Sequence, residues 1–141
     1  MPRHERFLRT FLRVLGTSAL TASFFVCVPN AWMDAIHQQL GLGTLPNVPI
    51  VSYLTRSTSA FYALLGGLLW TLSFDLRRHR VVLRYLGVAI VAFGLVLFVV
   101  DWQAGLPLWW RLWEGPIDCA FGMVILRLSS RISETGPRQT G

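Results

Sequence analysis

The chain has 141 residues, of which 53% are hydrophobic and only 14% are charged, whereas an ordinary soluble domain has about 25% charged residues. This composition excludes a typical soluble enzyme domain and predicts a single domain that lies in a membrane. All 13 basic residues are arginine, and they gather at the ends of apolar segments rather than on one face. That distribution is typical of topology signals, so we expect no nucleic-acid partner.

Four apolar segments approach the length of about 20 residues that a transmembrane helix needs. They cover residues 11–28, 50–74, 81–100 and 108–128. The first follows an arginine-rich start, as a signal peptide would, but it ends in the bulky residues "SFFVCV" before Pro29 and has no small-residue cleavage site. We therefore expect it to be a retained helix, and the fold to be an all-α bundle of four transmembrane helices.

The first connection contains a short amphipathic pattern. In "AWMDAIHQQLGLG", Trp32, Ile36 and Leu40 recur every four residues and would form one apolar face. Glycine and proline follow directly and are expected to end the helix. This pattern predicts a short interfacial helix that lies along the outer membrane surface.

Basic residues and tryptophans favour opposite ends of the segments. The N-terminus and the second connection, "DLRRHRVVLR", carry four arginines each, and the first connection carries none. By the positive-inside rule, both termini would be cytoplasmic in a multi-pass protein of the bacterial inner membrane. Five of the six tryptophans would then form an aromatic collar at the outer surface: Trp32, Trp102, Trp109, Trp110 and Trp113.

Arg56 is a cation within the second segment, "YLTRSTSAFY". At 100° per residue it shares a stripe of small residues, and the large apolar side chains lie opposite. Small residues let helices approach closely, so the stripe is expected to face the bundle and the large residues to face lipid. The small stripe is Ser52, Arg56, Ser59, Ala60, Ala63 and Gly67, and the large one is Leu54, Phe61, Leu65, Leu68, Leu69 and Leu72.

Three carboxylates are expected at the same depth as Arg56: Asp101, Glu114 and Asp118. Glu114 and Asp118 are like charges one helical turn apart, which is unfavourable without a nearby cation. Arg56 and Arg111 would supply that cation, so we expect a polar cluster. Other candidate members are Tyr53, Ser57, His37 and Asp34.

This cluster has two interpretations. It would be either a charge network that fixes helix register, or a small pocket for a lipid headgroup, a quinone-like ligand or a substrate, walled by Trp102, Trp109 and Trp113. Ionisable groups inside a membrane favour a functional role, but burial near the interface costs less. The sequence leaves both interpretations open.

The sequence contains no strong motif for metal binding, cofactor binding or catalysis. The two cysteines, Cys27 and Cys119, form no CxxC or Cys/His motif, and no histidine lies inside a predicted span, so we expect no metal, haem or other cofactor. Both cysteines fall near the outer ends of their segments, and a disulfide between them stays open. P-loop, dinucleotide-binding and serine-hydrolase motifs are missing, so we assign no catalytic residue.

The strings "WMDAIHQQLGLGTLPNVPIVSYLTRSTSAFYALLGG", "LRRHR", "VDWQAGLPLWW" and "EGP" resemble the BphX-like group of small four-helix bacterial membrane proteins, which are similar to DoxX-like proteins. The resemblance covers about residues 10–128. It implies the four-span topology and no particular reaction.

Two functions are therefore expected. The first is a non-enzymatic accessory or scaffold subunit that packs in the lipid bilayer beside other membrane subunits or beside further copies of itself. The alternative is a lipid-binding or small-molecule-binding protein, a transporter or an enzyme, that uses the polar cluster around Arg56.

Overall fold

The computed structural model describes residues 2–132, and its regular structure there is entirely α-helical, which confirms the predicted all-α class. The helices in chain order are α1 (Arg3–Leu20), α2 (Ser23–Cys27), α3 (Asn30–Gln39), α4 (Pro49–Phe74), α5 (Arg80–Gln103) and α6 (Leu108–Ser130). Prolines mark the starts of several helices, because proline has no backbone N–H to leave unpaired in the first turn. Pro49 is the first residue of α4, and Pro29 and Pro107 directly precede α3 and α6.

The segments predicted over residues 50–74, 81–100 and 108–128 are the continuous helices α4, α5 and α6. The segment predicted over residues 11–28 is different, because helix begins at Arg3 and is interrupted between α1 and α2. There the Thr21 hydroxyl donates to the Ser18 carbonyl (2.6 Å), and the Ala22 N–H donates to the Ala19 carbonyl three residues back (3.1 Å). A threonine side chain that bonds the local backbone in this way favours a tightened turn.

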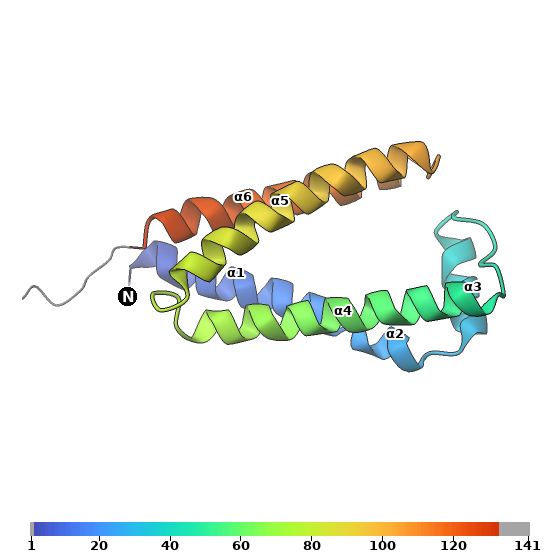
Figure 1. Ribbon diagram of the computed structural model, residues 1–141, viewed down its shortest axis with the longest axis horizontal. Helices are drawn as coiled ribbons and strands as arrows, with labels where there is room; N and C mark the ends of the chain where they lie inside the picture. The colour runs from blue at the N-terminus through green and yellow to red at the C-terminus, as the bar shows by residue number, and fades with distance from the viewer. Residues whose placement is uncertain (1, 133–141) are drawn as a thin grey trace, which may run out of the picture.

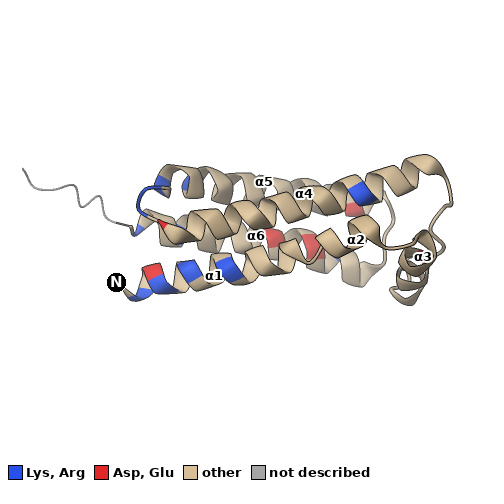
Figure 2. Cartoon of the chain, turned by 90° about the horizontal axis from the view of Figure 1, so that it is seen from below, with Lys and Arg blue, Asp and Glu red and all other residues tan. Residues whose placement is uncertain are grey.

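The four long helices form two pairs, α1 with α4 and α5 with α6. Figure 1 shows that the pairs converge at the end where the N-terminus and the α4–α5 turn lie, and diverge toward the opposite end. We call the first the basic end, because Figure 2 shows arginines on α1 and at the α4–α5 turn. We call the second the tryptophan end, because it holds α3 and the α5–α6 connection, with Trp32, Trp102 and Trp109.

The hydrophobic core lies toward the basic end, where the pairs meet. It consists of Leu8, Leu12, Leu69, Leu72, Leu76, Leu83, Leu86, Ile125 and Ile132. Phe11 of α1 packs edge-on against Phe121 of α6, with ring centroids 5.6 Å apart. Buried Glu5 binds Arg77 at 3.2 Å, which joins the start of α1 to the α4–α5 turn.

α4 turns a different face inward from the one predicted. A Cβ at Gly67 would meet nothing within 4 Å, whereas Leu69 and Leu72, expected to face lipid, are 1% and 3% exposed. Gly66 is the close contact, since its Cβ would lie 2.6 Å from the Gly16 carbonyl oxygen of α1. The inward stripe is rotated by about one residue, because large side chains fill the core while small ones are needed only where two backbones touch. It consists of Ser59, Tyr62, Gly66, Leu69 and Ser73.

Two stretches within residues 2–132 are long and apolar enough to cross a membrane: Arg3–Cys27 and Arg80–Gln103. Helices α4 and α6, with 26 and 23 residues, are long enough but have no stretch that is equally apolar over the length of a span. A short helix in the first connection is confirmed as α3, which runs across the tryptophan end (Figure 1). Its predicted apolar stripe is exposed, with Trp32 at 60%, Ile36 at 40% and Leu40 at 41%.

Candidate functional site

Arg56 binds the junction between α2 and α3. Its Nε donates to the Ser52 hydroxyl at 3.3 Å, and its Nη2 donates to the Val28 carbonyl at 3.0 Å and to Asn30 Oδ1 at 3.1 Å. Its Nη1 donates to the Val26 carbonyl near the end of α2, where a cation is electrostatically favoured. We call these five residues the Arg56 network.

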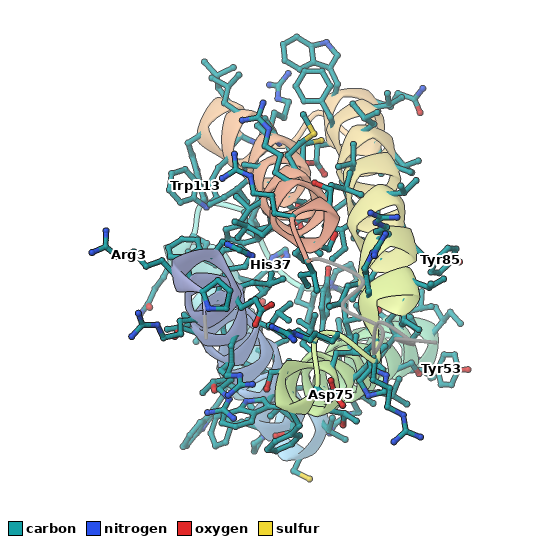
Figure 3. The ribbon with its side chains drawn as sticks, turned by 90° about the vertical axis from the view of Figure 1, so that its left-hand side faces the viewer. Arg3, His37, Tyr53, Asp75, Tyr85 and Trp113 are labelled. Atoms are coloured by element: carbon teal, nitrogen blue, oxygen red, sulfur yellow. The ribbon has the colours of Figure 1, made fainter. Side chains whose placement is uncertain are left out.

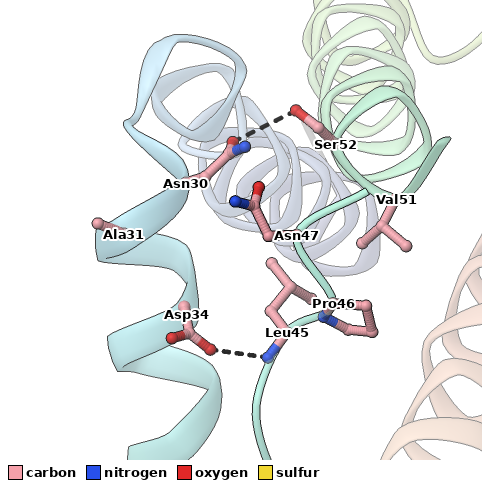
Figure 4. A pocket seen from close by; sticks show the side chains of 8 residues that line it. All are labelled: Asn30, Ala31, Asp34, Leu45, Pro46, Asn47, Val51 and Ser52. Atoms are coloured by element: carbon pink, nitrogen blue, oxygen red, sulfur yellow. Dashed lines mark hydrogen bonds between the residues drawn. The ribbon is translucent and has the colours of Figure 1, made fainter. Parts of the chain in front are cut away.

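The polar side chains beside this network are bonded to one another. A depression of about 190 Å³ lies beside the network. There the Ser52 hydroxyl donates to Asn30 Oδ1 at 3.3 Å, and Asp34 accepts from the Leu45 backbone N–H at 2.7 Å; Figure 4 draws both bonds as dashed lines. Gln38 also donates to Asp34, at 2.8 Å. Because these polar groups form hydrogen bonds with one another, they hold the first connection against α4.

The predicted cluster of Arg56 with the three carboxylates is wrong. Arg56 makes its hydrogen bonds to the α2–α3 junction, and no basic side chain among residues 2–132 forms an ion pair with Asp101, Glu114 or Asp118. The reason is the divergence of the helix pairs. The carboxylates lie on α5 and α6, which lean away from α4 at the tryptophan end (Figure 1).

The carboxylates form a group of their own. Asp101 of α5 is 3% exposed, and its Oδ2 accepts a hydrogen bond from no donor in the described part of the chain. Glu114 of α6 accepts from Trp110 Nε1 and lies within hydrogen-bonding reach of Asp101. Asp118 follows one turn later and is half-buried.

Arg111 faces an aromatic ring instead of the carboxylates. Its guanidinium carbon lies 4.8 Å from the ring centroid of Trp102, a cation–π contact that joins the ends of α5 and α6. Its Nε is buried without a hydrogen-bond partner among the described residues. Trp109 packs against Trp110 at 5.2 Å, Trp109 and Trp113 are 49% and 65% exposed, and Trp32 lies on α3.

Tyr53 and His37 also lie outside the carboxylate group. Tyr53 is 64% exposed and points away from the helices in Figure 3. The Nδ1 of His37 contacts the Gly43 carbonyl at 3.1 Å, within the first connection. Both cysteines are free thiols, Cys27 exposed and Cys119 half-buried, so no disulfide joins α2 to α6.

A central cavity of about 280 Å³ lies between the two helix pairs. All four long helices contribute to its walls, which are apolar except for Ser18, Tyr62 and Asp118. Two small side chains leave the space open, Ala19 of α1 and Ala22 of the α1–α2 turn. The other lining residues are Leu15, Leu65, Leu69, Ile90, Phe93 and Phe121.

A second hollow opens beside the central cavity, where α4 and α5 diverge. This α4–α5 groove has a volume of about 640 Å³, and Tyr62 lines both spaces. Its walls are almost wholly apolar: Phe61, Leu65, Leu86, Ala89, Ile90 and Phe93, with Ser57, Thr58 and Tyr62.

The sequence reasoning missed Tyr62 and Asn30, and it placed Trp110 in the aromatic collar without its hydrogen bond to Glu114. Tyr62 was detectable, because it lies four residues before Gly66 and three after Ser59, on the stripe that faces inward. Asn30 and Trp110 gave no comparable signal, since their roles depend on which side chain the tertiary fold places opposite them.

Within residues 2–132, no group of three or more His, Cys, Asp or Glu side chains is placed to hold a metal ion. The arrangement instead offers an apolar cavity with a phenol and a carboxyl group. No protein-family model matches the sequence, and no curated protein and no solved structure is significantly similar to it.

Proposed function

We propose that the chain is an integral protein of the bacterial inner membrane with four spans, formed by α1–α2, α4, α5 and α6. Two of these stretches have the length and apolar character of a span, and 26 and 23 residues give α4 and α6 sufficient length. The bilayer would cover the many exposed apolar side chains, such as Phe61, Leu64 and Val81. The basic end would be cytoplasmic, with both termini there, and α3 would lie on the outer surface.

We further propose that the protein binds a small lipophilic molecule in the central cavity. The observation that carries this proposal is that four helices enclose an apolar space of about 280 Å³ into which Tyr62 and Asp118 bring polar groups. Ligand sites are concave and mostly apolar, with a few polar groups that fix orientation, and have volumes from about 300 Å³ upward. This cavity, at the lower end of that range, suits a compact ligand.

The test is retention of a small molecule by the purified chain. Ala19→Leu places a larger side chain in the cavity, and we expect it to abolish retention, because the ligand and the leucine would compete for one space. Ala60→Leu is the matched control, since Ala60 is exposed on α4 and lines neither the cavity nor the α4–α5 groove. The measurement is mass spectrometry of small molecules extracted from chains purified in native lipid discs.

Retention in the unaltered chain and in Ala60→Leu, with loss in Ala19→Leu, would support the proposal. Equal retention in all three would place the molecule elsewhere, and absence of any retained molecule would refute the proposal.

Tyr62→Phe and Asp118→Asn remove one polar group each. We expect either variant to weaken retention about tenfold, the effect of leaving one polar group of a bound ligand unpaired.

An accessory-subunit role is a second candidate, favoured by the α4–α5 groove. Its apolar walls and its volume of about 640 Å³ would accept side chains from a helix of another subunit. Replacing Ala89 in this groove with tryptophan would then release a co-purifying subunit and leave ligand retention intact. A chain that purifies without any partner would contradict this role.

A further inference from the structure

Asp101 lies on the face of α5 that packs against α6. It follows Gly87 and Gly94 at intervals of seven residues, and both glycines contact α6 closely. A Cβ at Gly94 would lie 2.7 Å from the Gly115 carbonyl oxygen, so the two backbones almost touch at the residue that directly follows Glu114. This close approach is what buries Asp101 to 3% exposure.

No cation in the described part of the chain forms an ion pair with Asp101. Its Oδ2 is buried and accepts no hydrogen bond from any N–H or hydroxyl in the described part of the chain. Arg111 is the basic residue of α6 that is nearest to Asp101 in the sequence. It stacks on Trp102 and forms no ion pair with Asp101. An ionised carboxylate that is buried without a partner is costly. A proton is the smallest partner that would remove this cost.

Glu114 is placed to share such a proton. Its side chain lies within hydrogen-bonding reach of Asp101 and accepts a separate hydrogen bond from Trp110 Nε1. The other titratable groups facing this site are Asp118 of α6 and Tyr62 of α4, and both are neutral or negative, so neither adds positive charge. Two carboxyl groups this close do not both ionise readily, because the like charges repel.

We propose that Asp101 and Glu114 share one proton and form a proton-binding site between α5 and α6. The pair then carries a single negative charge, and the proton bridges the two carboxyl groups. Neither residue lines the central cavity, so this site is distinct from the proposed ligand site, although Asp118 and Tyr62 neighbour both.

The test uses the purified full-length chain and N,N′-dicyclohexylcarbodiimide. This reagent adds to an un-ionised carboxyl group: the acid proton moves to a nitrogen, the carboxyl oxygen bonds the central carbon, and acyl transfer gives a stable N-acylurea with no leaving group. We expect label on Asp101 or Glu114 at neutral pH, located by peptide mass spectrometry. In Asp101→Asn the amide would donate to an ionised Glu114, and label there should fall about tenfold.

Asp75→Asn is the control, because Asp75 is exposed at the α4–α5 turn and the substitution should leave labelling at the pair unchanged. Absence of label on both residues in the unaltered chain would overturn the proposal. Undiminished label on Glu114 in Asp101→Asn would also overturn it, because Glu114 would then hold its proton without sharing. If Asp101→Asn does not fold, Glu114→Gln gives the reciprocal comparison at Asp101. Infrared spectra of the unaltered chain must in addition show an un-ionised carboxyl band.

Discussion

Gly94→Ala is expected to lower the free energy of unfolding by about 1 to 3 kcal/mol, the usual cost of overpacking a close contact. The added Cβ would lie 2.7 Å from the Gly115 carbonyl oxygen and 2.8 Å from the Cys119 backbone nitrogen. Both are backbone atoms, so rotation of a side chain cannot relieve the clash, and α5 and α6 must separate. Detergent-induced unfolding, followed by tryptophan fluorescence, measures the change.

Gly67→Ala is the matched control for this prediction. Gly67 also lies within a long helix, but a Cβ there would meet nothing within 4 Å. Alanine favours helix over glycine by about 1 kcal/mol, so Gly67→Ala should leave stability unchanged or raise it. Equal destabilisation by both substitutions would contradict the proposed basis, because the loss would then come from helix glycine itself and not from the α5–α6 contact.

Arg56→Gln is expected to release the α2–α3 junction and lower stability by about 2 kcal/mol, because hydrogen bonds from a charged donor contribute about 1.5 to 3 kcal/mol each and Arg56 is only half-buried. Glutamine keeps a polar group but is shorter and lacks the planar fork that reaches two carbonyls and Asn30 at once. Hydrogen–deuterium exchange of residues 23–32 should accelerate about tenfold, as local opening becomes easier.

Arg78→Gln is the control variant for Arg56→Gln. Arg78 is exposed at the α4–α5 turn, at the opposite end of the molecule. This substitution removes the same charge without removing the contacts to the junction, so exchange of residues 23–32 should not change. Faster exchange in both variants would assign the effect to net charge. An unchanged rate in Arg56→Gln would show that the Arg56 network does not hold the junction.

Helix positions were largely predictable from local sequence. Apolar runs predicted α4, α5 and α6 to within a few residues, and α3 followed from the spacing of Trp32, Ile36 and Leu40. The interruption at Thr21 was missed because no proline or glycine marks it in the sequence between Thr17 and Ser23.

Which face of a helix packs against its neighbours was less predictable. A stripe of small residues was assumed to mark the whole packing face of α4, yet the structure packs α4 through Gly66 and through large leucines in the core. The assumption fails because α4 touches the backbone of a neighbouring helix at one depth only. Small residues are needed there, whereas large side chains fill the core at other depths.

The sequence by itself determined the helical composition, the concentration of arginine at one end and of tryptophan at the other, and the presence of four polar groups in apolar company: Arg56, Asp101, Glu114 and Asp118. These properties are local, because they depend on residue type and on spacing along one helix. Only the tertiary structure decided the partners. Arg56 binds backbone carbonyls of the α2–α3 junction because the two helix pairs diverge and the carboxylates lie on the other pair. Asp101 meets Glu114 because α5 and α6 pack closely through Gly94 and Gly115.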